Sequence, residues 1–150
     1  MPDLITTDLV DLDLDAADRH QATRSLAERL QAAGRVTDLE GFLADVRARE
    51  AQMPTGIEGG IGIPHARSAH VTEPTLGFGR SAKGVDFGAE DGPAHLIFLI
   101  AAPEGGGAEH MTILASLARR LVHASFREAL RQAPDQQTVV DLVNKEVLGQ

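Results

Sequence analysis

The feature that most constrains the fold of this chain is an unbroken apolar run, Leu96 to Ala102, which follows His95. Its seven residues place apolar side chains on both faces of a strand, which is typical of a central strand covered on each side. The run is far shorter than the ~20 residues that a membrane-spanning helix needs. It therefore predicts a buried strand over 95–102 inside a layered α/β domain, and residues 75–81 predict a second strand.

Apolar residues recur at helical spacing on both sides of these strands, which predicts helices that cover the sheet. The first helix is expected from about Ala16 to Gly34, because glycine commonly ends a helix. The second helix is expected to begin with Asp38 as its N-cap and to end near Glu50. Three further helices are expected towards the C-terminus: one after the glycines 105–107, with helical spacing over 111–122, a short one over 126–130, and a last one over about 135–148.

Two more segments have the pattern of strands. Residues 8–14 (DLVDLDL) alternate acidic and apolar side chains, as a half-buried strand does. The isoleucines at positions 57, 61 and 63 are all an even number of residues apart, which puts them on one face of a strand. A strand over this stretch would therefore bury the three together. Strands that alternate with helices predict an α/β fold. We expect one domain over residues 1–150, a sandwich with a mixed β-sheet of about five strands flanked by helices.

Charge and composition exclude several classes of protein. Lys and Arg number 14 against 22 Asp and Glu, a net charge of −8, and the only aromatic residues are five Phe. Nucleic acids and anionic membranes need clustered positive charge, so neither is an expected partner. The chain has no cysteine, which excludes disulfides and thiolate chemistry. Its N-terminus lacks the pattern of a signal peptide, so a cytoplasmic location without membrane insertion is expected.

The glycine-rich segment 55–65 (TGIEGGIGIPH) carries the best candidate for chemistry, His65. This histidine follows Pro64 at the end of the expected strand, and its small neighbours leave room for a bulky anion. A neutral imidazole is nucleophilic near its ordinary pKa of ~6.5 and can accept a transferred group. A histidine that only ends a strand beside a tight bend explains the spacing equally well, so both interpretations stay open at this point.

The other five histidines have ordinary explanations as surface or structural residues, because imidazole is amphipathic. A metal site is an alternative, since His65 and His70 lie five residues apart, with Glu73 nearby and His110 further along the chain. Such a spacing on a loop is weak evidence for a metal site. No metal and no cofactor are therefore expected.

Three segments in order resemble one known family: residues 49–67 (REAQMPTGIEGGIGIPHAR), 84–105 (GVDFGAEDGPAHLIFLIAAPEG) and 109–121 (EHMTILASLARRL). They look like enzyme IIA of the fructose–mannitol class of the bacterial sugar phosphotransferase system. The resemblance covers essentially the whole chain. Gly62 and Met111 are small departures, because alanine and leucine are usual in the family at these two positions.

The resemblance implies a phosphocarrier. His65 would take a phosphoryl group from the phosphocarrier HPr and pass it to a cysteine of a IIB domain, which works with a membrane IIC. The IIB part would lie on another chain or on a part of the polypeptide not included here. His110 corresponds to a second active-site histidine and Arg49 to an active-site arginine. Fructose is the sugar that the resemblance favours.

The chemistry of these residue types fits the implied roles. Arg49 could donate a charge-assisted fork to a phosphoryl group, although an arginine near a helix C-terminus is also favourable in water. His110 stands at a helix start, where it could bind the same anion or simply face water. Thr55 and Gly56 are expected to shape the wall of the site. HPr-type carriers present a positively charged face in the family's general picture, which an acidic partner would complement.

Two other functions remain as alternatives. Nitrogen-related members of the family accept phosphate at the same histidine and signal to regulators instead of feeding a transporter. A non-catalytic or metal-binding α/β module would require the Pro-His edge to be incidental. Phosphorylation of a IIB partner separates the first alternative from transport, and absence of phosphate acceptance would favour the second.

Overall fold

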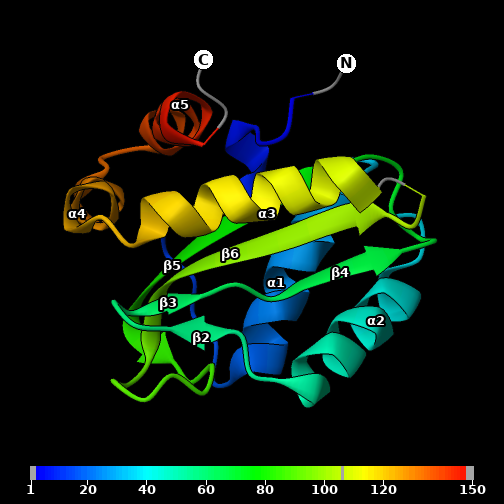
Figure 1. Cartoon of the computed structure of the whole chain (residues 1–150), viewed down its shortest axis with the longest axis horizontal. Coiled ribbons are helices and arrows are strands. Elements are labelled where there is room, and N and C mark those ends of the chain that lie inside the picture. Colours follow the sequence, from blue (N-terminus) through cyan, green and yellow to red (C-terminus); the bar gives the residue numbers. More distant parts are fainter. Residues whose placement is uncertain (1–2, 106, 148–150) are drawn as a thin grey trace.

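A computed structural model describes residues 3–105 and 107–147 of the chain; the side chains of residues 107–111, 113 and 114 lie outside this description. The described residues form a six-stranded mixed sheet with helices on both faces (Figure 1). The elements follow one another as a 3₁₀ helix η1 (Thr7–Leu9), β1 (Val10–Asp11), α1 (Arg19–Ala32), α2 (Leu39–Gln52), β2 (Gly56–Ile57), β3 (Ile61–Gly62), β4 (His65–Ser68), β5 (Thr75–Val85), β6 (Ala94–Pro103), α3 (Gly107–Leu121), α4 (Ala124–Gln132) and α5 (Gln136–Glu146).

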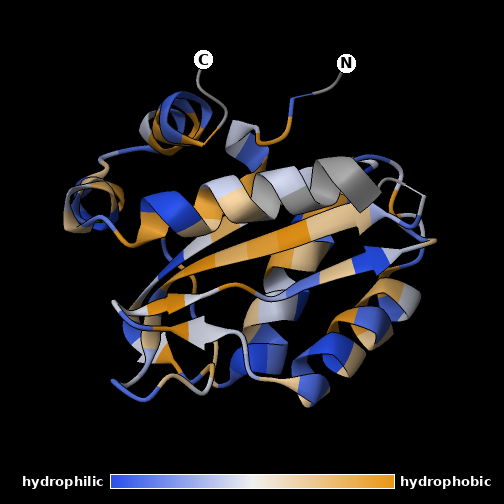
Figure 2. Ribbon diagram, viewed as in Figure 1, coloured by the Kyte–Doolittle hydropathy of each residue, from blue (hydrophilic) through white to orange (hydrophobic). Residues whose placement is uncertain are grey.

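Strand β6 is the centre of the sheet, as its apolar run predicts. It pairs antiparallel with β5 on one side and parallel with β3 and then β4 on the other. Beyond these neighbours, β1 pairs parallel with β5 and β2 pairs antiparallel with β3. Figure 2 shows the hydrophobic colour concentrated along β6, between more hydrophilic helix surfaces.

The alternating side chains of β6 divide the interior into two cores. Ile97, Leu99 and Ala101 point to the face that α1 and α2 cover. Leu96, Phe98 and Ile100 point to the opposite face, which α3, α4 and α5 cover. The prediction of a strand covered on both sides is therefore confirmed, and so is the α/β sandwich. The structure has six strands where about five were expected.

The helices begin where their caps are. The side chain of Asp18 accepts a hydrogen bond from the Gln21 amide and starts α1, two to three residues later than the apolar spacing suggests. Asp38 caps α2 in the same way, as predicted, by accepting from the Gly41 amide. Within the described residues no helix has the length and apolar character to cross a membrane.

The predicted strand over 8–14 is wrong for most of its length. Residues Thr7–Leu9 form the 3₁₀ helix η1 instead, in which the Leu9 amide donates to the Thr6 carbonyl. Only Val10 and Asp11 pair with β5. The Asp11 carboxylate then accepts a hydrogen bond from the Asp13 amide, a local turn that ends the strand.

The single strand expected across the three isoleucines is also wrong, because it is a hairpin. Strands β2 and β3 pair with each other, Ile57 opposite Ile61, around a turn that contains Gly59 and Gly60. Both glycines have positive φ angles, 101° and 78°, which side chains disfavour. The three isoleucines nevertheless pack on the same core, as their even spacing suggests.

Candidate functional site

His65 opens strand β4 at the exposed edge of the sheet. It pairs with Ile100 of β6, and laterally paired residues point to the same face, so the His65 side chain lies on the face that α3 covers. Only 8% of the residue is exposed. The Pro64 carbonyl accepts from the Ile100 amide and holds the chain on β6 just before the histidine.

The proton of the His65 ring is placed by the backbone. Nδ1 lies 2.7 Å from the Ile63 carbonyl oxygen, which can only accept a hydrogen bond. Nδ1 therefore carries the proton in the neutral ring, and the lone pair lies on Nε2. This tautomer makes Nε2 the nucleophilic nitrogen.

The surroundings of His65 keep its ring neutral. Burial lowers the pKa of His65 below that of an ordinary histidine. The hydrogen bond to the Ile63 carbonyl and the charge of Glu50 raise this pKa, and the positive charge of Arg49 lowers it, but burial outweighs the rest. At neutral pH the side chain is therefore uncharged.

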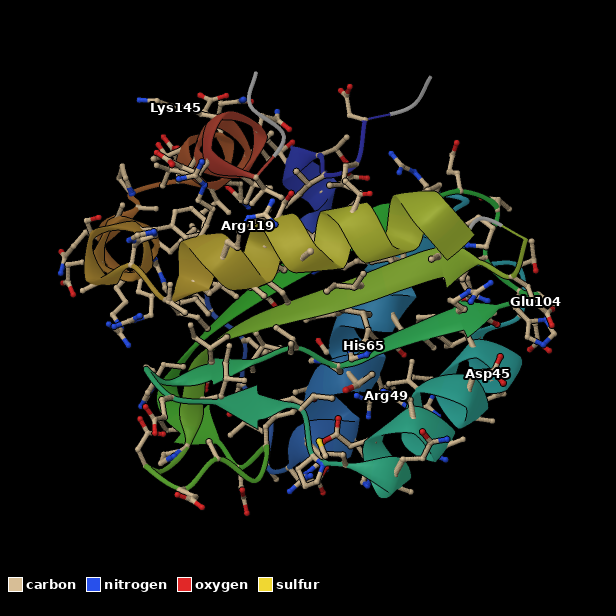
Figure 3. The ribbon with its side chains drawn as sticks, in the orientation of Figure 1. Asp45, Arg49, His65, Glu104, Arg119 and Lys145 are labelled. Carbon is tan, nitrogen blue, oxygen red and sulfur yellow. The ribbon has the colours of Figure 1, made fainter. Side chains whose placement is uncertain are left out.

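Arg49 comes to the site from the last turn of α2 (Figure 3). Its Nη1 donates to the Met53 carbonyl at 3.1 Å, which anchors the guanidinium at the end of this helix. The helix itself is tied to strand β4 because Ser68 Oγ donates to Asp45 Oδ2 at 2.6 Å. The structure thus brings Arg49 close enough to His65 for its positive charge to lower the pKa of the ring. A contact of Arg49 with a phosphoryl group stays a prediction.

Thr55 and Gly56 lie beside the segment that leads into His65. The Thr55 carbonyl accepts from the Ile63 amide at 3.1 Å, and only 4% of Thr55 is exposed. The Gly56 amide donates to the Phe87 carbonyl, and a Cβ at Gly56 would approach that oxygen to 2.7 Å. Both residues are therefore tightly packed near the site, and their contact with a phosphoryl group stays a prediction.

His110 lies in the first turn of α3, the helix on the His65 face, but its side chain is outside the described part of the structure. Its role also stays a prediction.

The metal alternative receives no support from the described residues. The His70 ring lies over Gly41, near the start of α2, and Glu73 lies 3.7 Å from Arg35. His95 Nδ1 bonds to the Ser81 carbonyl. The described part of the chain contains no group of three or more His, Asp or Glu residues arranged to hold a metal ion.

Glu50 also belongs to this neighbourhood, although no motif pointed to it. It is 8% exposed and lies on the buried side of α2 with Leu43 and Val46. Its Oε2 accepts from the Thr55 amide at 2.8 Å and its Oε1 accepts from Thr55 Oγ1 at 2.5 Å. The signal was available in the sequence, because a carboxylate continues an apolar helical stripe at 43, 46 and 50.

Comparison with known proteins decides the family. Residues 3–146 match the family described as "Phosphoenolpyruvate-dependent sugar phosphotransferase system, EIIA 2". The chain belongs to this family. It is a phosphoryl-carrying EIIA component of the sugar phosphotransferase system, and the resemblance seen in its motifs is confirmed.

Relatives of this EIIA chain occur alone and within longer proteins. A fructose-specific EIIA component of Haloferax volcanii is 42% identical over 137 residues, 91% of this chain and 89% of that protein. A fructose-specific EIIABC component of Bacillus subtilis is 35% identical over 144 residues, which are 95% of this chain but only 23% of that protein.

Solved structures share the whole EIIA fold. The nitrogen regulatory protein IIA-Ntr of Neisseria meningitidis superposes with a TM-score of 0.86 at 28% identity, covering 93% of this chain and 96% of that one. The mannitol IIA of Escherichia coli, in complex with phosphorylated mannitol IIB, gives a TM-score of 0.79 at 26% identity, covering 97% of this chain and 98% of that one.

Proposed function

We propose that Nε2 of His65 is the atom that carries the phosphoryl group in this EIIA component. One observation supports this assignment above all: the Nδ1 proton is held by the Ile63 carbonyl in a ring that burial keeps neutral. A neutral imidazole with a fixed tautomer is ready to attack without first losing a proton.

The transfer consists of two successive displacements at phosphorus. The Nε2 lone pair attacks the phosphorus of a phosphohistidine on HPr, the new N–P bond forms, and the donor nitrogen leaves with the electron pair of the old bond. In the second step a thiolate of IIB attacks the same phosphorus, an S–P bond forms, and His65 Nε2 regains its lone pair. Such transfers depend on in-line positioning and on donors for the phosphoryl oxygens.

Three parts of the neighbourhood assist this step. The Arg49 guanidinium donates to the phosphoryl oxygens from its anchored place at the end of α2. His110 donates to the same oxygens or orients the ring of His65, from the first turn of α3. Thr55 and Gly56 close the wall beside the segment that leads to His65.

The partners are proteins, since this domain has no need to touch the sugar. HPr delivers the phosphoryl group, and a IIB domain with its membrane IIC receives it; the chain contains no cysteine, so the IIB acceptor lies outside it. The Escherichia coli relative was solved in complex with phosphorylated IIB, which supports this pairing. Met53, 64% exposed and bonded to Arg49 through its carbonyl, offers an apolar contact at the edge of the site.

Fructose is the sugar of the system that we propose, because the relatives at 42% and 35% identity are both fructose-specific components. A regulatory role is a second candidate, supported by the TM-score of 0.86 with the nitrogen regulatory protein. Phosphorylation of a fructose IIB by this chain distinguishes the two, since a purely regulatory protein would not supply a IIB cysteine.

The assignment of His65 is tested by transfer from phosphoenolpyruvate through enzyme I and HPr, followed by intact mass. One acid-labile phosphoryl group is expected on the parent chain and none on His65→Ala. A control EIIA in the same reaction shows that the carrier is competent. A phosphorylated His65→Ala chain, or an unmodified parent beside a modified control, would overturn the assignment.

A further inference from the structure

We propose that Glu50 is a positioning residue that holds the His65 ring in its nucleophilic tautomer through Thr55 and Ile63. The inference rests on the function proposed above for His65, and it assigns a role to Glu50, a buried acidic side chain beside the site. Glu50 acts through its neighbours and does not touch the transferred group.

The burial of Glu50 is the first reason. It is 8% exposed on the apolar side of α2, next to Leu43, Val46 and Phe87, where an apolar residue would pack without desolvation. A buried carboxylate is costly unless hydrogen bonds compensate it. Three donors do so: the Thr55 amide, the Thr55 hydroxyl and Arg19 Nη1, the last at 3.1 Å from Oε2.

The second reason is an unbroken series of hydrogen bonds from this carboxylate to the catalytic ring. Glu50 holds the amide of Thr55 at 2.8 Å. The carbonyl of Thr55 accepts from the Ile63 amide at 3.1 Å, and the carbonyl of Ile63 accepts from His65 Nδ1 at 2.7 Å. Both backbone residues of the series, Thr55 and Ile63, thus use their amide N–H and their carbonyl oxygen in hydrogen bonds.

The consequence for His65 is geometric. Thr55 lies three residues beyond the last residue of α2, in a segment without regular structure, so the bonds to Glu50 help to fix its position. If Thr55 moves, the Ile63 amide loses its acceptor, so Ile63 is held less firmly and its carbonyl is no longer well aligned with Nδ1. A shift of about 1 Å in such a group costs on the order of a hundredfold in rate at worst.

The end of α2 carries two residues of this neighbourhood next to each other in the sequence. Arg49 and Glu50 are consecutive, so their side chains leave α2 in different directions. The positive charge of Arg49 lowers the pKa of the His65 ring, while Glu50 holds the backbone that orients this ring. One helix thereby positions both the guanidinium that donates hydrogen bonds to the phosphoryl oxygens and the ring that accepts the phosphoryl group.

The test compares Glu50→Gln with Glu40→Gln. Both substitutions remove a carboxylate of α2 that pairs with an arginine of α1, Arg19 for Glu50 and Arg24 for Glu40. Only Glu50 is linked to Thr55. The ring ¹⁵N resonances of His65, assigned by their loss in His65→Ala, report the tautomer in the unphosphorylated full chain, and the rate of acceptance from phospho-HPr is measured on the same samples.

For Glu50→Gln we expect the His65 resonances to move toward a mixture of tautomers and acceptance to fall about tenfold. Glu40→Gln is expected to leave both readouts at the parent values. Unchanged His65 resonances and an unchanged rate in a folded Glu50→Gln chain would overturn the proposal, as would equal effects of the two substitutions.

A milder pair keeps the test open if Glu50→Gln does not fold. Thr55→Val removes only the hydroxyl bond to Glu50, and Thr55→Ser keeps it. Tautomer mixing and slower acceptance in Thr55→Val, restored in Thr55→Ser, support the proposal; parent behaviour in Thr55→Val contradicts it. If the parent accepts no phosphoryl group, the function proposed for His65 fails, whereas the ¹⁵N readout still decides whether Glu50 orients the ring.

Discussion

Burial, one carbonyl and two neighbouring charges shift the pKa of His65 in opposite directions. Burial and Arg49 disfavour the charged ring, while the Ile63 carbonyl and Glu50 favour it. The balance lowers the pKa, because a ring that is only 8% exposed lacks most of the hydration that would stabilise its charged form. A carrier histidine benefits from this balance, since protonation would remove the Nε2 lone pair.

The first prediction concerns this proton. An NMR pH titration should place the midpoint of His65 below the ordinary histidine value of ~6.5, so acceptance should persist through mildly acidic pH and fall only below that midpoint. Arg49→Gln removes a positive charge that lowers the pKa, so its midpoint should move to higher pH. A parent midpoint at or above ~6.5, or a downward shift in Arg49→Gln, would contradict this account of the electrostatics.

At the scale of elements, the packing of the hairpin β2–β3 depends on the absence of a side chain at Gly62. A Cβ at Gly62 would lie 2.7 Å from the ring of Phe87, which is 1% exposed, so the ring fills the place of the missing methyl group. The departure from the alanine usual in the family is thus coupled to packing. It lies three residues before His65, in the strand that leads to the site.

Gly62→Ala should therefore destabilise the protein by about 1–3 kcal/mol, because the buried ring must move. Phe87→Leu should relieve this strain, so the double variant is expected to be more stable than the sum of the two single effects by about 0.5–3 kcal/mol. Gly105→Ala is the control, since a Cβ there meets nothing within 4 Å. Urea unfolding of the parent, the two single variants and the double variant measures the double-mutant cycle, with Gly105→Ala beside them as the control. Strict additivity of the two single effects would rule out the contact as the cause.

At the scale of the whole molecule, charge governs how this component meets its partners. The net charge is −8, and the chain acts by repeated encounters with other proteins. Opposite charge on HPr would steer these encounters and raise the association rate. The apolar contact that Met53 offers beside Arg49 would then complete docking at short range.

Transfer from phospho-HPr should therefore slow by about tenfold between about 0.01 M and about 0.15 M salt, as the screening length falls from about 30 Å to about 8 Å. Rapid mixing and quenching, followed by intact-mass measurement, gives the second-order rate of transfer at limiting concentrations of phospho-HPr. The maximal rate at saturating HPr serves as the control, because screening acts on the encounter more than on the bound complex. A second-order rate indifferent to salt would exclude electrostatic steering.

Local chemistry of the sequence determined the central strand, the helix cap at Asp38, and His65 as the candidate nucleophile. These follow from short-range rules: an apolar run must be covered on both faces, and a carboxylate caps the helix that follows it. The family was readable because three segments carry its motifs in order.

Tertiary structure decided the features that depend on residues distant in the chain. The alternation in 8–14 predicts a strand, but residues 7–9 form a 3₁₀ helix and only Val10 and Asp11 pair with β5 before a turn at Asp11. The even spacing of the three isoleucines fits a single strand as well as it fits two strands joined by a turn, so the spacing does not distinguish the two. The positive φ angles of Gly59 and Gly60 are those of a turn, and β2 and β3 pair around it. The tautomer of His65 and the link to Glu50 arise only when the segments 50–55 and 63–65 lie side by side, because a hydrogen bond depends on distance in space and not on separation in sequence.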